Sequence, residues 1–136
     1  MNSSKTEWQS ELAWGHHNIG AFHLEQSDLD GALNEFSAEL KILETLRSSS
    51  PGDSELLSRI SDAQSWLGDV AEKQGRLTDS FHQYAMEAAV LTQLSRTSPG
   101  TKSWRFLLAN TLLFQVDLAT VTGQFDVART KLEDSQ

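Results

Sequence analysis

The sequence predicts an all-α protein built from helical hairpins that repeat every 48 residues. The tripeptide Ser-Pro-Gly occurs at residues 50–52 and again at 98–100, so the two copies lie 48 residues apart. When the sequence is aligned with itself at this spacing, without a gap, the aligned positions carry residues of the same chemical type along the chain. Similarity at a fixed period is typical of stacked repeats. No segment alternates strictly enough to predict a β-strand.

The matching positions run through three units. They are Trp8/Leu56/Trp104, Leu12/Ile60/Leu108, Ile19/Leu67/Gln115, Gly20/Gly68/Val116, Ser27/Gly75/Gly123, Leu29/Leu77/Phe125, Ala32/Ser80/Ala128 and Phe36/Tyr84/Leu132. The first two units also share Glu39/Glu87, Leu43/Leu91 and Leu46/Leu94. We therefore expect a single domain over residues 1–136, with units at approximately 4–51, 52–99 and 100–136.

Each unit is predicted to hold two helices. Their ranges are 6–26 and 29–48, then 54–74 and 77–97, then 102–122 and 125–134. In the second unit, apolar residues recur at three- and four-residue steps, as in amphipathic helices. Asp53 is the predicted N-cap of the third helix and Gly75 its predicted stop. Pro51 and Pro99 fall only between units, where helix-breaking residues are tolerated.

These residues resemble the tetratricopeptide repeat. The resemblance rests on Trp66-Leu67-Gly68, Ala71, Gly75, Ser80 and Tyr84 in the second unit, on Ile19-Gly20, Ala32 and Phe36 in the first, and on Gly123, Ala128 and Leu132 in the third. The family's usual tryptophan is replaced by His16, Gln64 and Leu112. The usual repeat has 34 residues, and the extra length adds about two turns to each helix, as in long bacterial repeats of this type. The resemblance implies a right-handed α-solenoid (an α-α superhelix) of three hairpins; a generic helical-hairpin bundle is the alternative.

The composition of the chain disfavours or excludes several classes of function. The chain has 19 acidic and 11 basic side chains, for a net charge of −8, which disfavours nucleic-acid binding. It has no cysteine, which excludes disulfides and thiolate sites and fits a reducing cytoplasm. No signal peptide is visible, and the uncharged apolar segment at 106–116 is too short to span a bilayer. We expect a cytoplasmic protein without membrane contact.

No motif for catalysis, cofactor binding or metal binding is found. His16 and His23 would lie about 10.5 Å apart along a helix, too far to share one ion. The sequence has no nucleophile elbow, no phosphate-binding loop and no dinucleotide-binding glycine pattern. We therefore expect neither enzymatic activity nor a cofactor.

The resemblance implies that the first helix of each pair lines a concave groove that binds a peptide or protein segment. The groove positions are Trp14, His17, Ala21, Glu25, Asp62, Ser65, Asp69, Lys73, Asn110, Leu113 and Asp117. The alternative is an ordinary solvated face on an acidic protein. A clamp for chaperone carboxyl termini is not expected, because the positions where it needs lysine, asparagine and arginine carry His17, Ala21, Trp66, Asn110 and Phe114.

The tryptophans differ in their expected roles. Trp14 aligns with Asp62 and Asn110, so we expect it to be exposed and available for contact. Trp8 and Trp104 align with Leu56 and are expected to pack between units, and Trp66 is expected in the core.

The sequence thus predicts a non-catalytic protein-interaction module. One alternative is a regulatory or sensor region of a larger signalling enzyme, such as a kinase, ATPase or protease; another is a small-molecule site near Trp14 and His17. Between Trp104 and Val121, 12 of 18 residues are hydrophobic. We therefore expect Phe106 and Leu113 to be covered by a second copy or by sequence absent from this chain, unless that helix packs only inward against the second unit.

Overall fold

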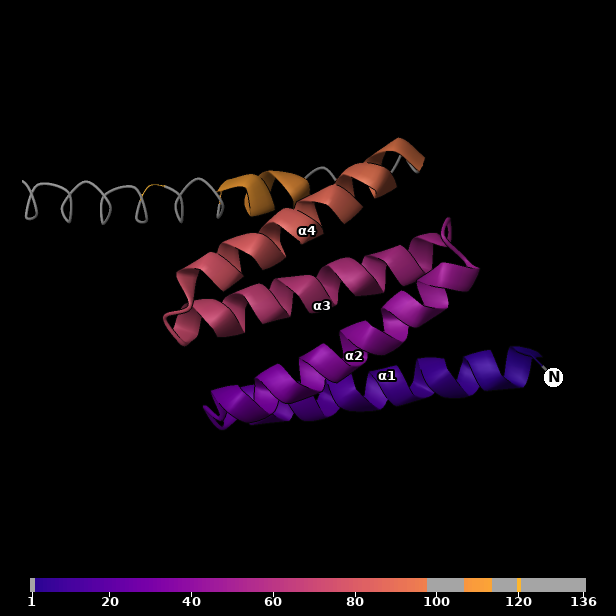
Figure 1. Ribbon diagram of the computed structural model, residues 1–136, viewed down its shortest axis with the longest axis horizontal. Coiled ribbons are helices and arrows are strands. Elements are labelled where there is room, and N and C mark those ends of the chain that lie inside the picture. The colour runs from indigo at the N-terminus through magenta and orange to yellow at the C-terminus, as the bar shows by residue number, and fades with distance from the viewer. Residues whose placement is uncertain (1, 98–106, 114–119, 121–136) are drawn as a thin grey trace, which may run out of the picture.

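The protein consists of long α-helices that follow one another as antiparallel hairpins (Figure 1). A computed structural model describes residues 2–97, 107–113 and 120. Its helices are α1 (Asn2–Glu25), α2 (Leu29–Ser49), α3 (Ser54–Lys73) and α4 (Leu77–Thr97), and residues 107–113 are also helical. No strand occurs in this described part of the chain, which confirms the predicted all-α class. Most of the predicted helix at 102–122, and all of that at 125–134, lie outside the described residues.

The helix ends are set by polar caps and by two residues with positive φ. Asp53 caps α3 as predicted, since its Oδ1 accepts a hydrogen bond of 3.2 Å from the backbone N–H of Leu56. Asp28 caps α2 in the same way through Gly31. Gly75 follows α3 with φ +78°, as expected of a helix stop, and Ser27 follows α1 with φ +60°.

The two described hairpins share one 48-residue register. α2 and α4 begin at Leu29 and Leu77 and end at Ser49 and Thr97. In both hairpins, a glycine of the first helix also packs closely against an aromatic ring of the second helix. A Cβ atom at Gly20 would lie 3.0 Å from the Phe36 ring, and one at Gly68 would lie 2.7 Å from the Tyr84 ring.

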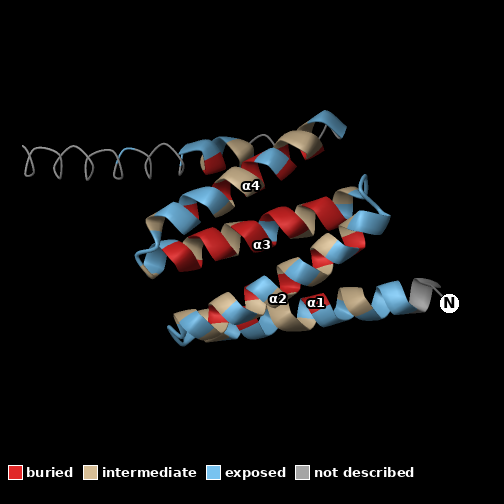
Figure 2. Ribbon diagram, viewed as in Figure 1, coloured by how far each residue is buried: buried red, intermediate tan, exposed pale blue. Residues whose placement is uncertain are grey.

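The core is centred on α3 (Figure 2). One cluster joins α2, α3 and α4 through residues such as Leu43, Ile60 and Leu91, and it also includes Ala13 of α1. A second cluster holds Phe36 of α2 against Leu67 of α3. The extensive contacts join α1 to α2, α2 to α3 and α3 to α4, so α3 has a long neighbour on both sides.

Two of the predicted tryptophan roles can be compared with this core. Trp66 is partly buried and stacks on Phe36, with ring centroids 5.7 Å apart. Trp8 is exposed, so its predicted packing between units is wrong. The physical reason is that its counterpart Leu56 lies under α2, whereas no described helix covers that face of α1. Trp104 lies outside the described residues.

None of the described helices combines the length and the apolar composition needed to cross a bilayer.

Candidate functional site: a pocket between successive hairpins

A pocket of about 260 Å³ opens where α1, α3 and residues 107–113 approach one another. We call it the groove pocket; it is lined by Trp14, Glu39, Ser58, Arg59, Ser61, Asp62, Ser65, Glu87 and Leu107. Three of these residues, Trp14, Asp62 and Ser65, belong to the predicted groove. The pocket therefore brings together predicted groove positions from two hairpins.

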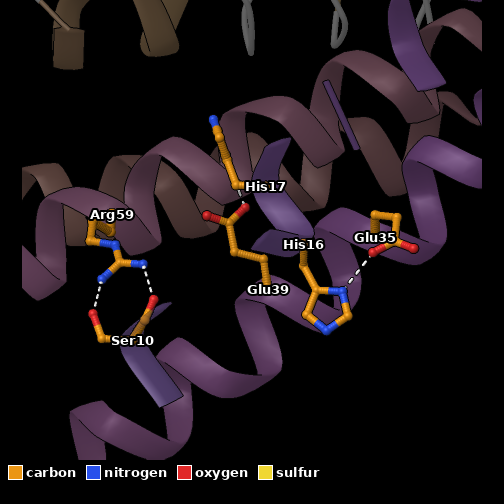
Figure 3. A network of polar contacts seen from close by, with 6 residues as sticks. All are labelled: Ser10, His16, His17, Glu35, Glu39 and Arg59. Carbon is orange, nitrogen blue, oxygen red and sulfur yellow. Dashed lines mark hydrogen bonds and ion pairs between the residues drawn. The ribbon is translucent and has the colours of Figure 1, made fainter. Parts of the chain in front are cut away.

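The inner part of the groove pocket carries two buried carboxyl groups at equivalent places. Glu39 on α2 is 2% exposed and Glu87 on α4 is 6% exposed, and the two residues are 48 apart. Nδ1 of His17 lies 3.2 Å from Oε1 of Glu39 (Figure 3). Glu87 is hydrogen-bonded to Ser65, the counterpart of His17, and its Oε1 lies 3.0 Å from Oγ1 of Thr111. Each glutamate thus contacts the groove position of its own hairpin.

Burial alters the acidity of these carboxyl groups. It raises the pKa of Glu87 to about 7, although hydrogen bonds from Thr111 and Ser65 act in the opposite direction. Burial also raises the pKa of Glu39, against the opposing effect of His17. Asp62 is exposed by surface area, yet protein atoms around its recess raise the pKa of its carboxyl as well. The charge of the groove pocket therefore changes near neutral pH.

Arg59 joins α3 to α1 at the edge of the groove pocket. Its guanidinium carbon lies 4.3 Å from the centre of the Trp14 ring, a cation–π contact. Its Nη1 donates to the Ser10 hydroxyl at 2.6 Å and its Nη2 to the Ser10 carbonyl at 3.1 Å (Figure 3). The pocket lining holds this one arginine and three carboxyl groups, those of Glu39, Asp62 and Glu87. The pocket is therefore acidic overall whenever these carboxyls are ionised.

The other predicted groove residues of α1 and α3 do not line the groove pocket. His17 is partly buried and contacts the Trp14 ring edge-on, with centroids 5.6 Å apart. Asp69 accepts a hydrogen bond of 2.9 Å from Lys73, so these two charges neutralise each other. Ala21 is partly buried and Glu25 is exposed at the end of α1.

The third unit is described only in part. Asn110 is partly buried and Leu113 is exposed. Asp117 and Phe106 lie outside the described residues. The predicted cover over Phe106 and Leu113 stays a prediction.

Histidine–carboxylate pairs account for three of the four histidines. His16 lies 2.6 Å from Glu35, and His23 lies 3.0 Å from Asp28. No group of three or more histidine, aspartate or glutamate side chains in the described part of the chain could hold a metal ion.

Sequence reasoning missed Glu39, Glu87 and Arg59 as pocket residues. The repetition of Glu39 as Glu87, among apolar positions of the second helices, was the signal that could have found the glutamates. Arg59 left no such signal, because it aligns with Glu11 and Leu107.

No protein-family model, no curated protein and no solved structure matches this chain. Its function must therefore be inferred from its own residues.

Proposed function

We propose that the protein is a non-catalytic interaction module: a tetratricopeptide-like, right-handed α-solenoid that binds a peptide or protein segment on its concave face. The observation that carries this proposal is the groove pocket, where Trp14 of one hairpin and Asp62 and Ser65 of the next line the same hollow. A segment lying across it would contact both hairpins at once. The acidic, cysteine-free composition suits action in the cytoplasm.

The chemistry of the groove pocket favours a cationic side chain on the bound segment. Asp62 supplies negative charge, as do the buried Glu39 and Glu87 when they are ionised, and Trp14 supplies an aromatic wall that a lysine or arginine can lie against. The volume of about 260 Å³ is below the 300–1,000 Å³ typical of small-molecule sites. One long side chain of a larger partner suits this space better than a free metabolite.

The test is fluorescence anisotropy with labelled twelve-residue peptides of alternating glycine and serine that carry two arginines, two lysines or two glutamates. We expect the basic peptides to bind and to weaken between 50 and 300 mM salt, because ionic strength screens exposed charges. Trp14→Ala and Asp62→Asn should each weaken binding at least fivefold.

Glu72→Gln is the matched control, since Glu72 is exposed on α3 but is neither a predicted groove residue nor part of the groove-pocket lining. It should change binding less than twofold. Equal binding of the glutamate peptide, or binding that does not depend on salt, would contradict the proposal.

A further inference from the structure

One face of α1 carries an exposed apolar stripe. We call Trp8, Leu12, Gly15, Ile19 and Phe22 the α1 stripe; steps of three and four residues place them on a single helix face. Its four large side chains are between 39% and 63% exposed. Figure 2 shows the corresponding pale blue colour along α1, in contrast to the red of α3.

The second hairpin shows how the equivalent face of α3 is covered. The residues 48 positions after the α1 stripe are Leu56, Ile60, Ala63, Leu67 and Val70 on α3, and none of them is more than 7% exposed. Their cover is α2. Leu43 and Leu46 of α2 pack in the cluster that contains Leu56 and Ile60, while Leu29 and Leu33 pack in the cluster that contains Leu67 and Val70.

This internal template also fixes a direction and a close approach. The start of α2 lies against the end of α3, and the end of α2 lies against the start of α3, so the covering helix is antiparallel. At the centre of the α1 stripe, a Cβ atom at Gly15 would meet nothing within 4 Å. Its counterpart Ala63 is fully buried. Another helix therefore has room to approach α1 closely at Gly15.

Charge distinguishes the helix that fits α1 from α2 itself. Arg59 of α3 and Glu39 of the covering helix line the same pocket, so their opposite charges lie near each other. The counterpart of Arg59 on α1 is Glu11, which is exposed. A helix seated on the α1 stripe would thus meet a negative charge where α2 meets a positive one. Its matching residue should be basic.

We propose that the α1 stripe docks an amphipathic helix of a partner protein, in the place that α2 takes on α3. This helix runs antiparallel to α1, presents leucine-like side chains every three to four residues, and carries lysine or arginine where α2 carries Glu39. The proposal does not depend on the function proposed for the concave face, because none of the α1 stripe residues lines the groove pocket.

The experiment uses the 136-residue chain and synthetic peptides that cover residues 28–50, the α2 sequence. We expect the peptide with Glu39→Lys to bind at least fivefold more tightly than the unmodified peptide in a fluorescence anisotropy titration. The protein variant Glu11→Arg should reverse this preference. Ile19→Glu should weaken binding of the Glu39→Lys peptide at least tenfold.

Phe81→Glu is the control, since Phe81 is an exposed apolar residue on α4, away from the α1 stripe. It should leave binding within twofold of wild type. Circular dichroism should show unchanged helix content in all variants, and Glu11→Arg tests the proposal even where Ile19→Glu disturbs folding.

Three results would overturn the proposal. They are no binding of either peptide, binding that Ile19→Glu and Glu11→Arg both leave unchanged, and a dimer of the protein alone that Ile19→Glu dissociates in light scattering. The last result would mean that a second copy covers the α1 stripe. Loss of basic-peptide binding in Trp14→Ala, with α2-peptide binding retained, would separate this surface from the concave face.

Discussion

The first and second hairpins share helix ends and a glycine–aromatic contact, but their first helices lie in different surroundings. α3 is covered by α2 on one side and by α4 on the other, whereas α1 packs extensively only against α2. The same alignment position is therefore exposed as Leu12 on α1 and fully buried as Ile60 on α3. Burial of this face is set by the neighbouring helix, since the face itself is apolar in both α1 and α3.

The largest expected difference is between truncations at this shared position. Ile60→Ala should lower the free energy of unfolding by about 2–5 kcal/mol, because it leaves a cavity in the core. Leu12→Ala should lower it by less than about 1 kcal/mol, because Leu12 is already exposed. Urea unfolding followed by circular dichroism measures both. Similar losses for the two variants would show that α1 is covered in the isolated protein.

The buried glutamates should make stability depend on pH. The pKa of Glu87 is raised to about 7 in the folded protein, so folding favours its protonated form. The stability that the protonated Glu87 contributes is fully present below the pKa of this group in the unfolded chain, near 4.5. It is lost as pH rises through 7. The loss amounts to at most about 3 kcal/mol by the shift in pKa.

Glu87→Gln removes this titration. Its stability relative to wild type should therefore rise between pH 5 and pH 8, as measured by urea unfolding at each pH. Glu39→Gln should act with the same sign, because burial raises the pKa of Glu39 too. A constant difference between wild type and Glu87→Gln across this range would show that Glu87 titrates normally.

A third comparison concerns His16 and Gln64, which align at the 48-residue spacing. His16 pairs with Glu35 at 2.6 Å, whereas their counterparts Gln64 and Gln83 each have a buried Oε1 without a hydrogen-bond partner in the described part of the chain. An unsatisfied buried polar group costs about 1–3 kcal/mol. Gln64→Leu, which introduces the residue of the third unit, should thus stabilise the protein by about 1 kcal/mol, and His16→Leu should destabilise it. Thermal unfolding tests both signs, and a loss of stability in Gln64→Leu would contradict the assignment.

The smallest effect is expected at the turns inside the hairpins. Ser27 has φ +60° and its counterpart Gly75 has φ +78°. This conformation is strained for serine and free of strain for glycine. Ser27→Gly should raise the free energy of unfolding by up to about 1 kcal/mol, and Gly75→Ser should lower it by a similar amount. Equal melting temperatures for wild type and both variants would contradict this expectation.

The fold was more predictable than the candidate site, and the residues show why. The spacing of apolar residues, Asp53 and Gly75 predicted the helices and two of their ends, because these are local properties of the chain. The exposure of Trp8 could not be predicted, because it depends on whether another helix covers α1. The burial of Glu39 and Glu87 was difficult to predict, because a glutamate repeated on a helix is usually a solvent-facing residue. Trp14, Asp62 and Ser65 were predicted to share a surface and do line one pocket, while Arg59 had no repeated counterpart to reveal it.

The packing of each long helix mainly against the one before and the one after it has a consequence for how the chain folds and opens. Most of these contacts join residues that are near one another in the sequence. They form by closing short loops, which favours rapid folding. Such an array can also open from one end while the rest stays intact. The amide protons of α3 should exchange most slowly with solvent. The amide protons at the start of α1 should exchange fastest among those of the four long helices. The exposed surface at the start of α1 therefore lies on the segment of the two hairpins that opens most readily.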